Sequence, residues 1–218
     1  MLGFDVSERT VSRLMPRRAP KSESAQCWMT FLRNHRDAIA AMDFFVVRTL
    51  TFRVLYIWFA IQHGRRRIVH CHVTDHPDAA WVAQQLREAF PFDTAPRHLV
   101  FDRDGIFSAQ VVWMVKALGA EPARTAPRCP WQNGVAERWI GSVRRELLDH
   151  VVVFNDRHLL RLLREYVAYH HDDRTHFGLA KATPTGRLRQ ARPLGDAKVI
   201  ALPRLGGLHH RYEWRGPA

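Results

Sequence analysis

The sequence predicts an α/β domain built on a mixed sheet, with a short helical piece before it and a basic extension after it. Two observations predict this class. Three apolar segments come first and are separated by short turns, which is typical of an antiparallel meander. Later apolar segments alternate with helical patterns, which favours parallel strands joined by right-handed crossovers. Helices are then expected on both faces of the sheet.

The elements follow in order along the chain. Strands are expected over residues 40–47, 52–61, 67–73, 97–102 and 121–125. Start signals at Thr74, Asp75 and Pro77 precede a helix whose buried stripe is Ala79, Val82, Leu86 and Phe90. Further helices are expected over 108–118, ended by Gly119, from near Val135, and over about 157–170. A small hairpin is expected within 199–214.

The charge of the chain points to a polyanionic partner. Its 218 residues carry 33 Lys and Arg against 21 Asp and Glu, a formal net charge of +12. The longest clean apolar run is the eight residues 54–61, whereas a membrane-spanning helix needs roughly 20. The N-terminus does not read as a secretory signal, and the three cysteines form no CxxC pair. These features favour a cytoplasmic protein that binds nucleic acid and no membrane.

Three carboxylates stand out by their positions. Asp43 is the only charge within residues 39–47, where an uncompensated carboxylate is costly. Asp102 ends an expected strand, and Glu137 opens an expected helix. Taken singly, an Asp in the place of Asp102 is most often a turn residue, and a Glu in the place of Glu137 is most often a helix-dipole partner. Together they suit phosphoryl transfer by two Mg²⁺ ions about 3.5–4 Å apart, because Mg²⁺ prefers carboxylate ligands.

Longer motifs around these residues resemble one family. Residues 102–107 (DRDGIF) are similar to a D-x-G-x-x-[FY] turn with one displaced glycine, and residues 126–138 (APRCPWQNGVAER) to S-P-x-x-N-G-x-A-E-R. Residues 169–184 resemble the closing motif Y-x-x-x-R-x-H-x-x-L-x-x-x-T-P, and the step from Asp102 to Glu137 is 35. Residues 38–186 therefore resemble the DDE transposase/integrase core domain, and most closely the bacterial insertion-sequence transposases.

The resemblance implies a ribonuclease H-like fold and a DNA strand-transferase. Asp43, Asp102 and Glu137 would be both catalytic residues and metal ligands, with Mg²⁺ as cofactor and Mn²⁺ as a substitute. Asp104, two residues beyond Asp102, stays open as the alternative ligand. The implied partners are double-stranded DNA, at element ends and target, and further copies of the chain. The implied location is the cytoplasm of a bacterium, at the nucleoid. A truncated DNA-binding remnant and a ribonuclease H-like nuclease are the alternative functions.

Residues 1–27 are interpreted as a partial helix-turn-helix and a linker. Arg9 and Arg13 share one face of a short helix that resembles a recognition helix, although a short amphipathic surface helix explains the same pattern. The adjacent His70, Cys71 and His72 do not have the spacing of a zinc site.

The remaining expected DNA contacts are cationic or polar. Arg138, Arg144 and Arg145 lie away from the apolar stripe of the Glu137 helix, where they could hold phosphates, although a solvated helix face fits as well. Gln132 and Asn133 form a loop suited to backbone or base contacts. Residues 174–218 contribute +7 of the net charge. The extension over 187–218 is therefore expected to track DNA through Arg187, Arg189 and Arg192.

Overall fold

The computed structural model describes residues 23–193 and 195–216, and it divides the chain into two units, residues 1–34 and 35–218. The described part of the first unit is helix α2 (Glu23–Asn34), which overlaps the segment interpreted as a linker. Glu23 in its first turn and Arg33 in its last turn complement the helix dipole. Arg9 and Arg13, on the expected recognition helix, lie outside the described residues.

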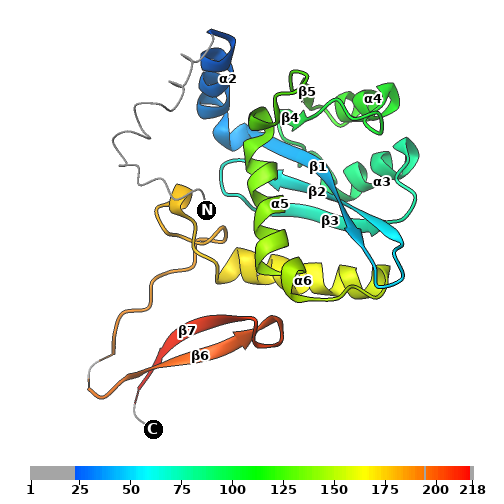
Figure 1. The fold of residues 1–218 in the computed structure, drawn as a ribbon. Coiled ribbons are helices and arrows are strands. Elements are labelled where there is room, and N and C mark those ends of the chain that lie inside the picture. Colours follow the sequence, from blue (N-terminus) through cyan, green and yellow to red (C-terminus); the bar gives the residue numbers. More distant parts are fainter. Residues whose placement is uncertain (1–22, 194, 217–218) are drawn as a thin grey trace, which may run out of the picture. The chain divides into compact units, whose positions relative to one another are not determined.

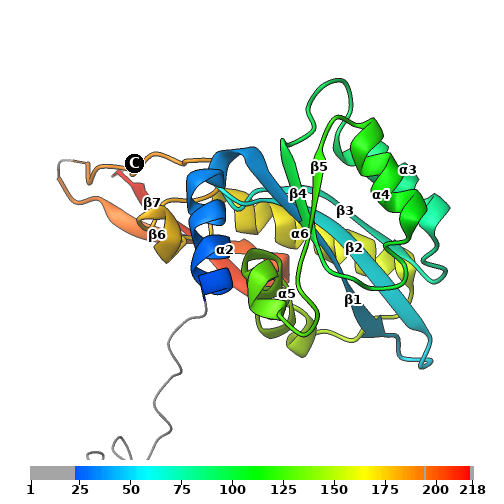
Figure 2. The ribbon, with the colours of Figure 1, turned by 90° about the horizontal axis from the view of Figure 1, so that it is seen from above.

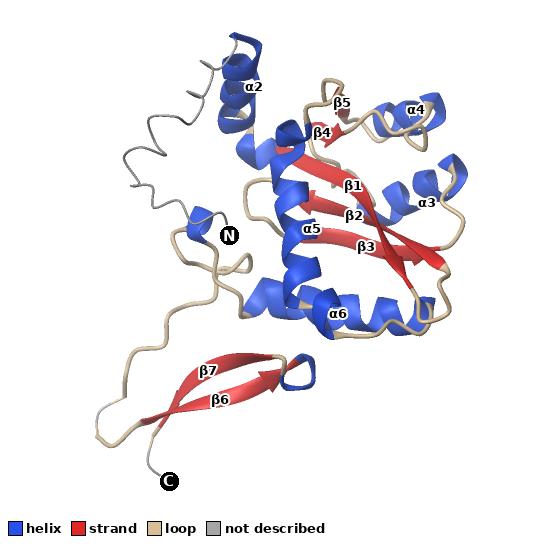
Figure 3. Cartoon of the chain, in the orientation of Figure 1, coloured by secondary structure: helices blue, strands red, loops and turns tan. Residues whose placement is uncertain are grey.

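The second unit is built on a five-stranded mixed sheet with the order β3-β2-β1-β4-β5 (Figures 1 and 3). Strands β1 (Ile39–Arg48), β2 (Val54–Gln62) and β3 (Ile68–Thr74) form the antiparallel meander. Strands β4 (His98–Phe101) and β5 (Glu121–Arg124) extend the sheet in parallel on the other side of β1. The fold predicted from the sequence is confirmed.

Helices cover both faces of this sheet. Helices α3 (Ala79–Ala89) and α4 (Ala109–Ala117) pack on the face that carries Met42 and Trp58. Helix α5 (Gly134–Glu146) lies on the opposite face, as Figure 2 shows. There Trp139 packs on Phe59, with ring centroids 4.2 Å apart. Helix α6 (Asp156–Asp172) contacts β3.

Helix α3 begins later than the sequence signals predict. Asp78 caps α3, because its carboxylate accepts a hydrogen bond from the backbone N–H of Trp81 at 2.7 Å. The helix therefore begins after the signals at 74–77, with its expected stripe at Val82 and Leu86 fully buried. Short 3₁₀ turns complete the unit: η1 (Arg36–Ala38), η2 (Pro130–Asn133), η3 (Leu148–His150), η4 (Phe177–Leu179) and η5 (Leu205–Gly207).

The basic extension ends in the expected hairpin, formed by β6 (Lys198–Arg204) and β7 (His209–Arg215). A two-stranded hairpin is marginal by itself. This one is attached to the end of α6 through Asp173, whose side chain is 2% exposed and pairs with Arg204 at 2.8 Å and Arg187 at 3.2 Å. His209 also donates a hydrogen bond to the backbone oxygen of Glu146 at 2.7 Å. None of the helices in the described segments has the length and apolar character needed to cross a membrane.

Candidate active site

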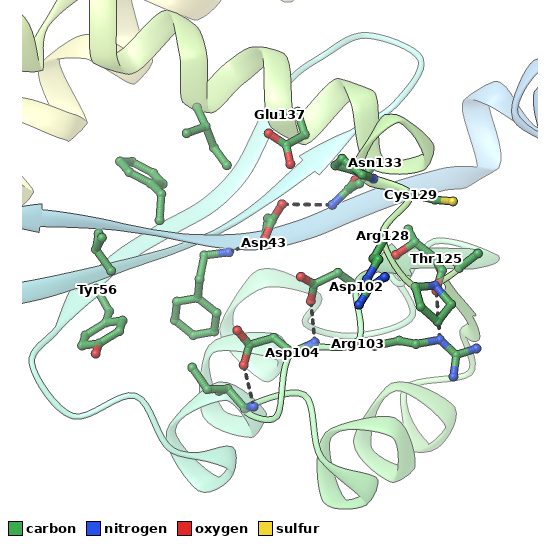
Figure 4. Close-up of a pocket in the computed structure, with 18 of the residues that line it drawn as sticks. Asp43, Tyr56, Asp102, Arg103, Asp104, Thr125, Arg128, Cys129, Asn133 and Glu137 are labelled. Carbon is green, nitrogen blue, oxygen red and sulfur yellow. Dashed lines mark hydrogen bonds between the residues drawn. The ribbon is translucent and has the colours of Figure 1, made fainter.

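The central carboxylate of the site is Asp43, in the middle of β1. Side chains alternate between the two faces of a strand, so Asp43 shares the face of α5 with Phe45 and lies opposite Phe59 of β2. It is only 9% exposed. Its Oδ1 accepts a hydrogen bond from the backbone N–H of Phe44 at 2.8 Å, and its Oδ2 accepts one from Asn133 Nδ2 at 3.2 Å (Figure 4).

Asp102 reaches the same place from the neighbouring strand. In the parallel pairing of β1 with β4, Val100 lies beside Ala41. Continuing this register by two residues brings Asp102 level with Asp43 and on the same face. Asp102 is half-buried and accepts a hydrogen bond from the backbone N–H of Asp104 at 2.9 Å. Asp104 is exposed, and its own Oδ1 caps the turn by accepting from Ile106 N–H at 2.9 Å. The register therefore favours Asp102 over Asp104 as the partner of Asp43.

Glu137 comes from the first turn of α5, and all these carboxylates line one pocket. Asn133, Glu137, Ile140 and Arg144 follow one another at helical spacing along the flank of α5 that faces this pocket. The pocket has a volume of about 710 Å³. Its charged lining residues are Asp43, Asp102, Asp104, Glu137, Arg103, Arg128 and Arg144. The site thus combines a carboxylate centre with three guanidinium groups, as Figure 4 shows in part.

The electrostatics of the pocket disfavour a negative charge on Asp43. The pKa of Asp43 is raised to about 7, mainly by burial and to a smaller extent by the neighbouring carboxylates of Asp102, Glu137 and Asp104, while the hydrogen bond from the Phe44 N–H lowers it. A carboxylate in this setting is expensive to ionise. A cation placed among these oxygens would offset that cost.

The donor chemistry of this pocket fits a hard divalent cation. Carboxylate and amide oxygens are the ligands that Mg²⁺ prefers. The Oδ1 atom of Asn133, beside Asp43, is buried and finds no hydrogen-bond partner among the described residues. As they stand, the described residues include no group of three His, Cys, Asp or Glu side chains that could hold a metal ion. Asp43, Asp102 and Glu137 would therefore have to draw closer together around a bound ion.

Comparisons with known proteins agree with this geometry. Residues 118–184 match a family model described as integrase core domain. The catalytic core domain of BIV integrase is similar to the chain at 20% identity, over 68% of this chain and 91% of that one, with a TM-score of 0.50. Residues 118–184 thus match the integrase core domain, and the chain as a whole has the fold of integrase and transposase catalytic cores.

Two further solved structures share this fold. The Mos1 transposase catalytic domain, solved with raltegravir and magnesium, is 14% identical over 76% of this chain and 85% of that one, with a TM-score of 0.56. A chain of the simian T-cell lymphotropic virus intasome is 16% identical over 83% of this chain and 67% of that one, with a TM-score of 0.54. At these identities the likeness establishes a ribonuclease H-like fold. No curated protein matches the chain.

Two residues expected to contact DNA have internal roles in this core. Gln132 and Asn133 are 8% and 4% exposed. Gln132 accepts a hydrogen bond from the backbone N–H of Ala126, and Asn133 donates to Asp43 and to the backbone oxygen of Met42. In the folded chain these amides position the loop before Glu137 and the carboxylate of Asp43, and direct contact of either residue with DNA stays a prediction.

The expected arginines are distributed over three places. Arg144 lies over the ring of Phe45 at 5.9 Å and lines the carboxylate pocket. Arg138 and Arg145 lie on another flank of α5. In the extension, Arg187 is paired with Asp173, Arg192 lies over Trp214 at 5.4 Å, and Arg189 is exposed.

Arg103 and Arg128, which the sequence did not predict as site residues, also line the carboxylate pocket. Arg103 stands between the two aspartates of the turn after β4, and its Nε donates to the backbone oxygen of Thr125 at 3.0 Å. Arg103 lies in the motif segment 102–107 and Arg128 in the segment 126–138. Their closeness in sequence to the motif carboxylates is the feature that could have indicated a place in the site.

Proposed function

We propose that this chain catalyses Mg²⁺-dependent phosphodiester hydrolysis and DNA strand transfer, as the catalytic core of a transposase. The observation that carries the proposal is Asp43, a buried carboxylate next to Asp102 and Glu137 with its pKa raised to about 7 mainly by burial. A carboxylate so disfavoured is typical of functional sites. The integrase/transposase core agrees with this chemistry.

Asp43, Asp102 and Glu137 are the residues that would hold Mg²⁺, with Mn²⁺ as a substitute. When bound, the ions would supply positive charge to the phosphoryl group and orient its oxygens. Asn133 holds Asp43 in place through its 3.2 Å hydrogen bond. Arg144, Arg103 and Arg128 line the pocket where a phosphodiester would lie, and their guanidinium groups suit its oxygens.

The substrate under this proposal is double-stranded DNA, first the end of a mobile element and then a target. The net charge of +12 supports a polyanionic substrate. Assembly of several copies on the DNA is part of the proposal, since one similar structure is an intasome. A location at the nucleoid of a bacterial cytoplasm would follow from these partners.

The test is Mg²⁺-dependent joining of a pre-cut DNA end to a second duplex. We expect Asp43→Asn, Asp102→Asn and Glu137→Gln each to abolish joining, with double changes costing no more than single ones, because loss of one ligand disables the shared ion site. DNA binding should persist in all three. Asp104→Asn is the matched control, since it removes the same charge two residues from Asp102.

The outcomes separate the candidate functions. Near-normal joining by any one of the three variants would refute this set of ligands, and loss of joining in Asp104→Asn alone would assign that role to Asp104. Mg²⁺-dependent cleavage without joining by the wild type would favour a ribonuclease H-like nuclease. DNA binding with neither reaction would indicate a non-transposing remnant.

A further inference from the structure

A second pocket lies on the other flank of α5 from Glu137. It has a volume of about 410 Å³. Helix α5 contributes Arg138, Ser142 and Arg145, the turn after β2 contributes Arg66, and the segment after α6 contributes Arg174. No Asp or Glu belongs to the residues that line it. The pocket is therefore cationic, in contrast to the carboxylate pocket.

Most of these cations have no anionic partner among residues 23–193 and 195–216. Arg174 is held by Glu146, with nitrogen–oxygen distances of 2.6 and 2.8 Å. Within the described part of the chain, no ion pair is found for Arg66, Arg138 or Arg145. The pKa of Arg66 is lowered, first by burial and then by Arg138, Arg36 and Arg174. The folded chain thus gathers like charges that repel one another.

The pocket also presents buried donors that nothing in the structure satisfies. The indole Nε1 of Trp139 and the Nε of Arg66 are buried and have no hydrogen-bond partner in the described part of the chain, and Trp139 is 2% exposed. A buried donor left unpaired costs about 1–3 kcal/mol. The His170 and His176 rings, which also line the pocket, have pKa values lowered to about 3 and about 4, mainly by burial, so they remain neutral at pH 7. An acceptor bearing negative charge would satisfy the donors and offset the repulsion.

The backbone around Arg66 is shaped to admit its side chain. A Cβ added to Gly178 would clash with the guanidinium of Arg66, so glycine at this position lets Arg66 lie against the chain. Gly178, His176 and Arg174 all belong to the closing motif 169–184, which the carboxylate pocket leaves unexplained. That motif supplies one wall of the cationic pocket.

We propose that this pocket binds a phosphate group of the DNA backbone, as a second DNA contact separate from the carboxylate pocket. Arginine guanidinium groups present several N–H donors in a plane that matches phosphate oxygens. The identification of the phosphate as part of DNA rests on the proposed function. The two pockets lie on different flanks of α5, so a phosphate bound here is a different one from the phosphodiester at the carboxylates.

The test compares Arg66→Gln and Arg145→Gln with Arg164→Gln, an exposed arginine of α6 that lines neither pocket. All three changes remove one positive charge. Binding of the full chain to a random-sequence duplex is measured in EDTA over a range of salt concentrations. Each lost phosphate contact should flatten the log–log salt slope by about 0.9. We expect this flattening in both pocket variants and no change in the control.

A second measurement separates binding from folding. Removing a cation from a group of like charges should leave the melting temperature of Arg66→Gln equal to or above that of the wild type. A lower melting temperature of Arg66→Gln, with an unchanged slope in Arg145→Gln, would show that the arginines are structural and would overturn the proposal.

Two further outcomes identify the source of the phosphate and keep the two proposals apart. If sodium pyrophosphate raises the melting temperature of the wild type but not of Arg66→Gln, while the DNA slopes stay unchanged, the pocket binds free phosphate compounds and the assignment to DNA is overturned. Flattened slopes in a chain that joins no DNA would support the pocket and refute the strand transferase. Unchanged slopes in a chain that does join DNA would refute the phosphate pocket and support the strand transferase.

Discussion

Replacement of Asp43 by Asn should stabilise the metal-free protein while abolishing its reaction. The raised pKa means that folding makes ionisation of Asp43 unfavourable. Between the ordinary pKa of 3.8 and about 7, at about 1.36 kcal/mol per pKa unit, the difference corresponds to about 4 kcal/mol. An Asn at this position keeps an oxygen that accepts from the Phe44 N–H. Its NH₂ group, however, would replace the oxygen that accepts from Asn133 Nδ2, and the loss of that hydrogen bond costs about 1 kcal/mol. The free energy of unfolding of Asp43→Asn is therefore expected to exceed that of the wild type by about 3 kcal/mol.

The sign of this effect depends on pH. Below about pH 4 the carboxyl is protonated in both states, so the folded wild type carries no ionisation cost. Between about pH 4 and 7 the unfolded chain loses this proton while the folded chain keeps it, so the wild type loses stability as the pH rises. Above about pH 7 the full cost applies. The advantage of Asp43→Asn should therefore be largest near pH 8 and vanish near pH 4.

The measurement is denaturant unfolding in EDTA at pH 8, 6 and 4. Asp104→Asn, an exposed residue whose capping oxygen is retained, should stay within about 0.5 kcal/mol of the wild type. Added Mg²⁺ should stabilise the wild type and leave Asp43→Asn unchanged, because only a ligand that binds the folded state stabilises it. An Asp43→Asn protein less stable than the wild type at pH 8 would refute the reasoning.

Two other substitutions test contacts elsewhere. Asp173→Asn should release the hairpin, at a cost of up to about 3 kcal/mol, because it removes the buried carboxylate shared by Arg187, Arg204 and Arg211 and leaves only Glu213 beside Arg187 and Arg211. Amide hydrogen exchange should then rise over 198–215 and stay unchanged in β1. Gly178→Ala should displace Arg66 and flatten the salt slope of DNA binding as Arg66→Gln does. Gly216→Ala, where an added Cβ meets nothing within 4 Å, is its control, and an equal slope in both would contradict the expected role of Arg66.

The sequence predicted the sheet and the carboxylate residues because both depend on local patterns. An isolated charge within an apolar strand marks Asp43, and a strand followed by a polar turn marks Asp102. The partner of Asp43 was not predictable in this way. Asn133 lies 90 residues further along the chain and reaches Asp43 only through the packing of α5 on β1. From the sequence alone, an amide in a loop such as Asn133 is interpreted as a surface residue, because the packing that buries it is not known.

The arginines of the extension illustrate a second limit. Arg187 was interpreted as a DNA contact because positive charge is dense after residue 174. In the folded chain it is bound to Asp173, together with Arg204 and Arg211. The composition of a segment gives its number of arginines but does not show which of them are paired with a carboxylate. Only the structure separates Arg187 from Arg66, which has no such partner among the described residues.

The orientation of helix α5 about its own axis determines which of its residues face each of the two proposed DNA contacts. Glu137 and Arg138 are neighbours in sequence, yet successive helical residues point about 100° apart, so one faces the carboxylate pocket and the other the cationic pocket. Trp139 sets this rotation, because its ring is buried against Phe59 at 4.2 Å and Phe45 at 5.8 Å. A turn of the helix that moved Glu137 would move Arg138 and Arg145 by the same angle. The packing of one tryptophan therefore positions a metal ligand on one flank and the proposed phosphate donors on the other.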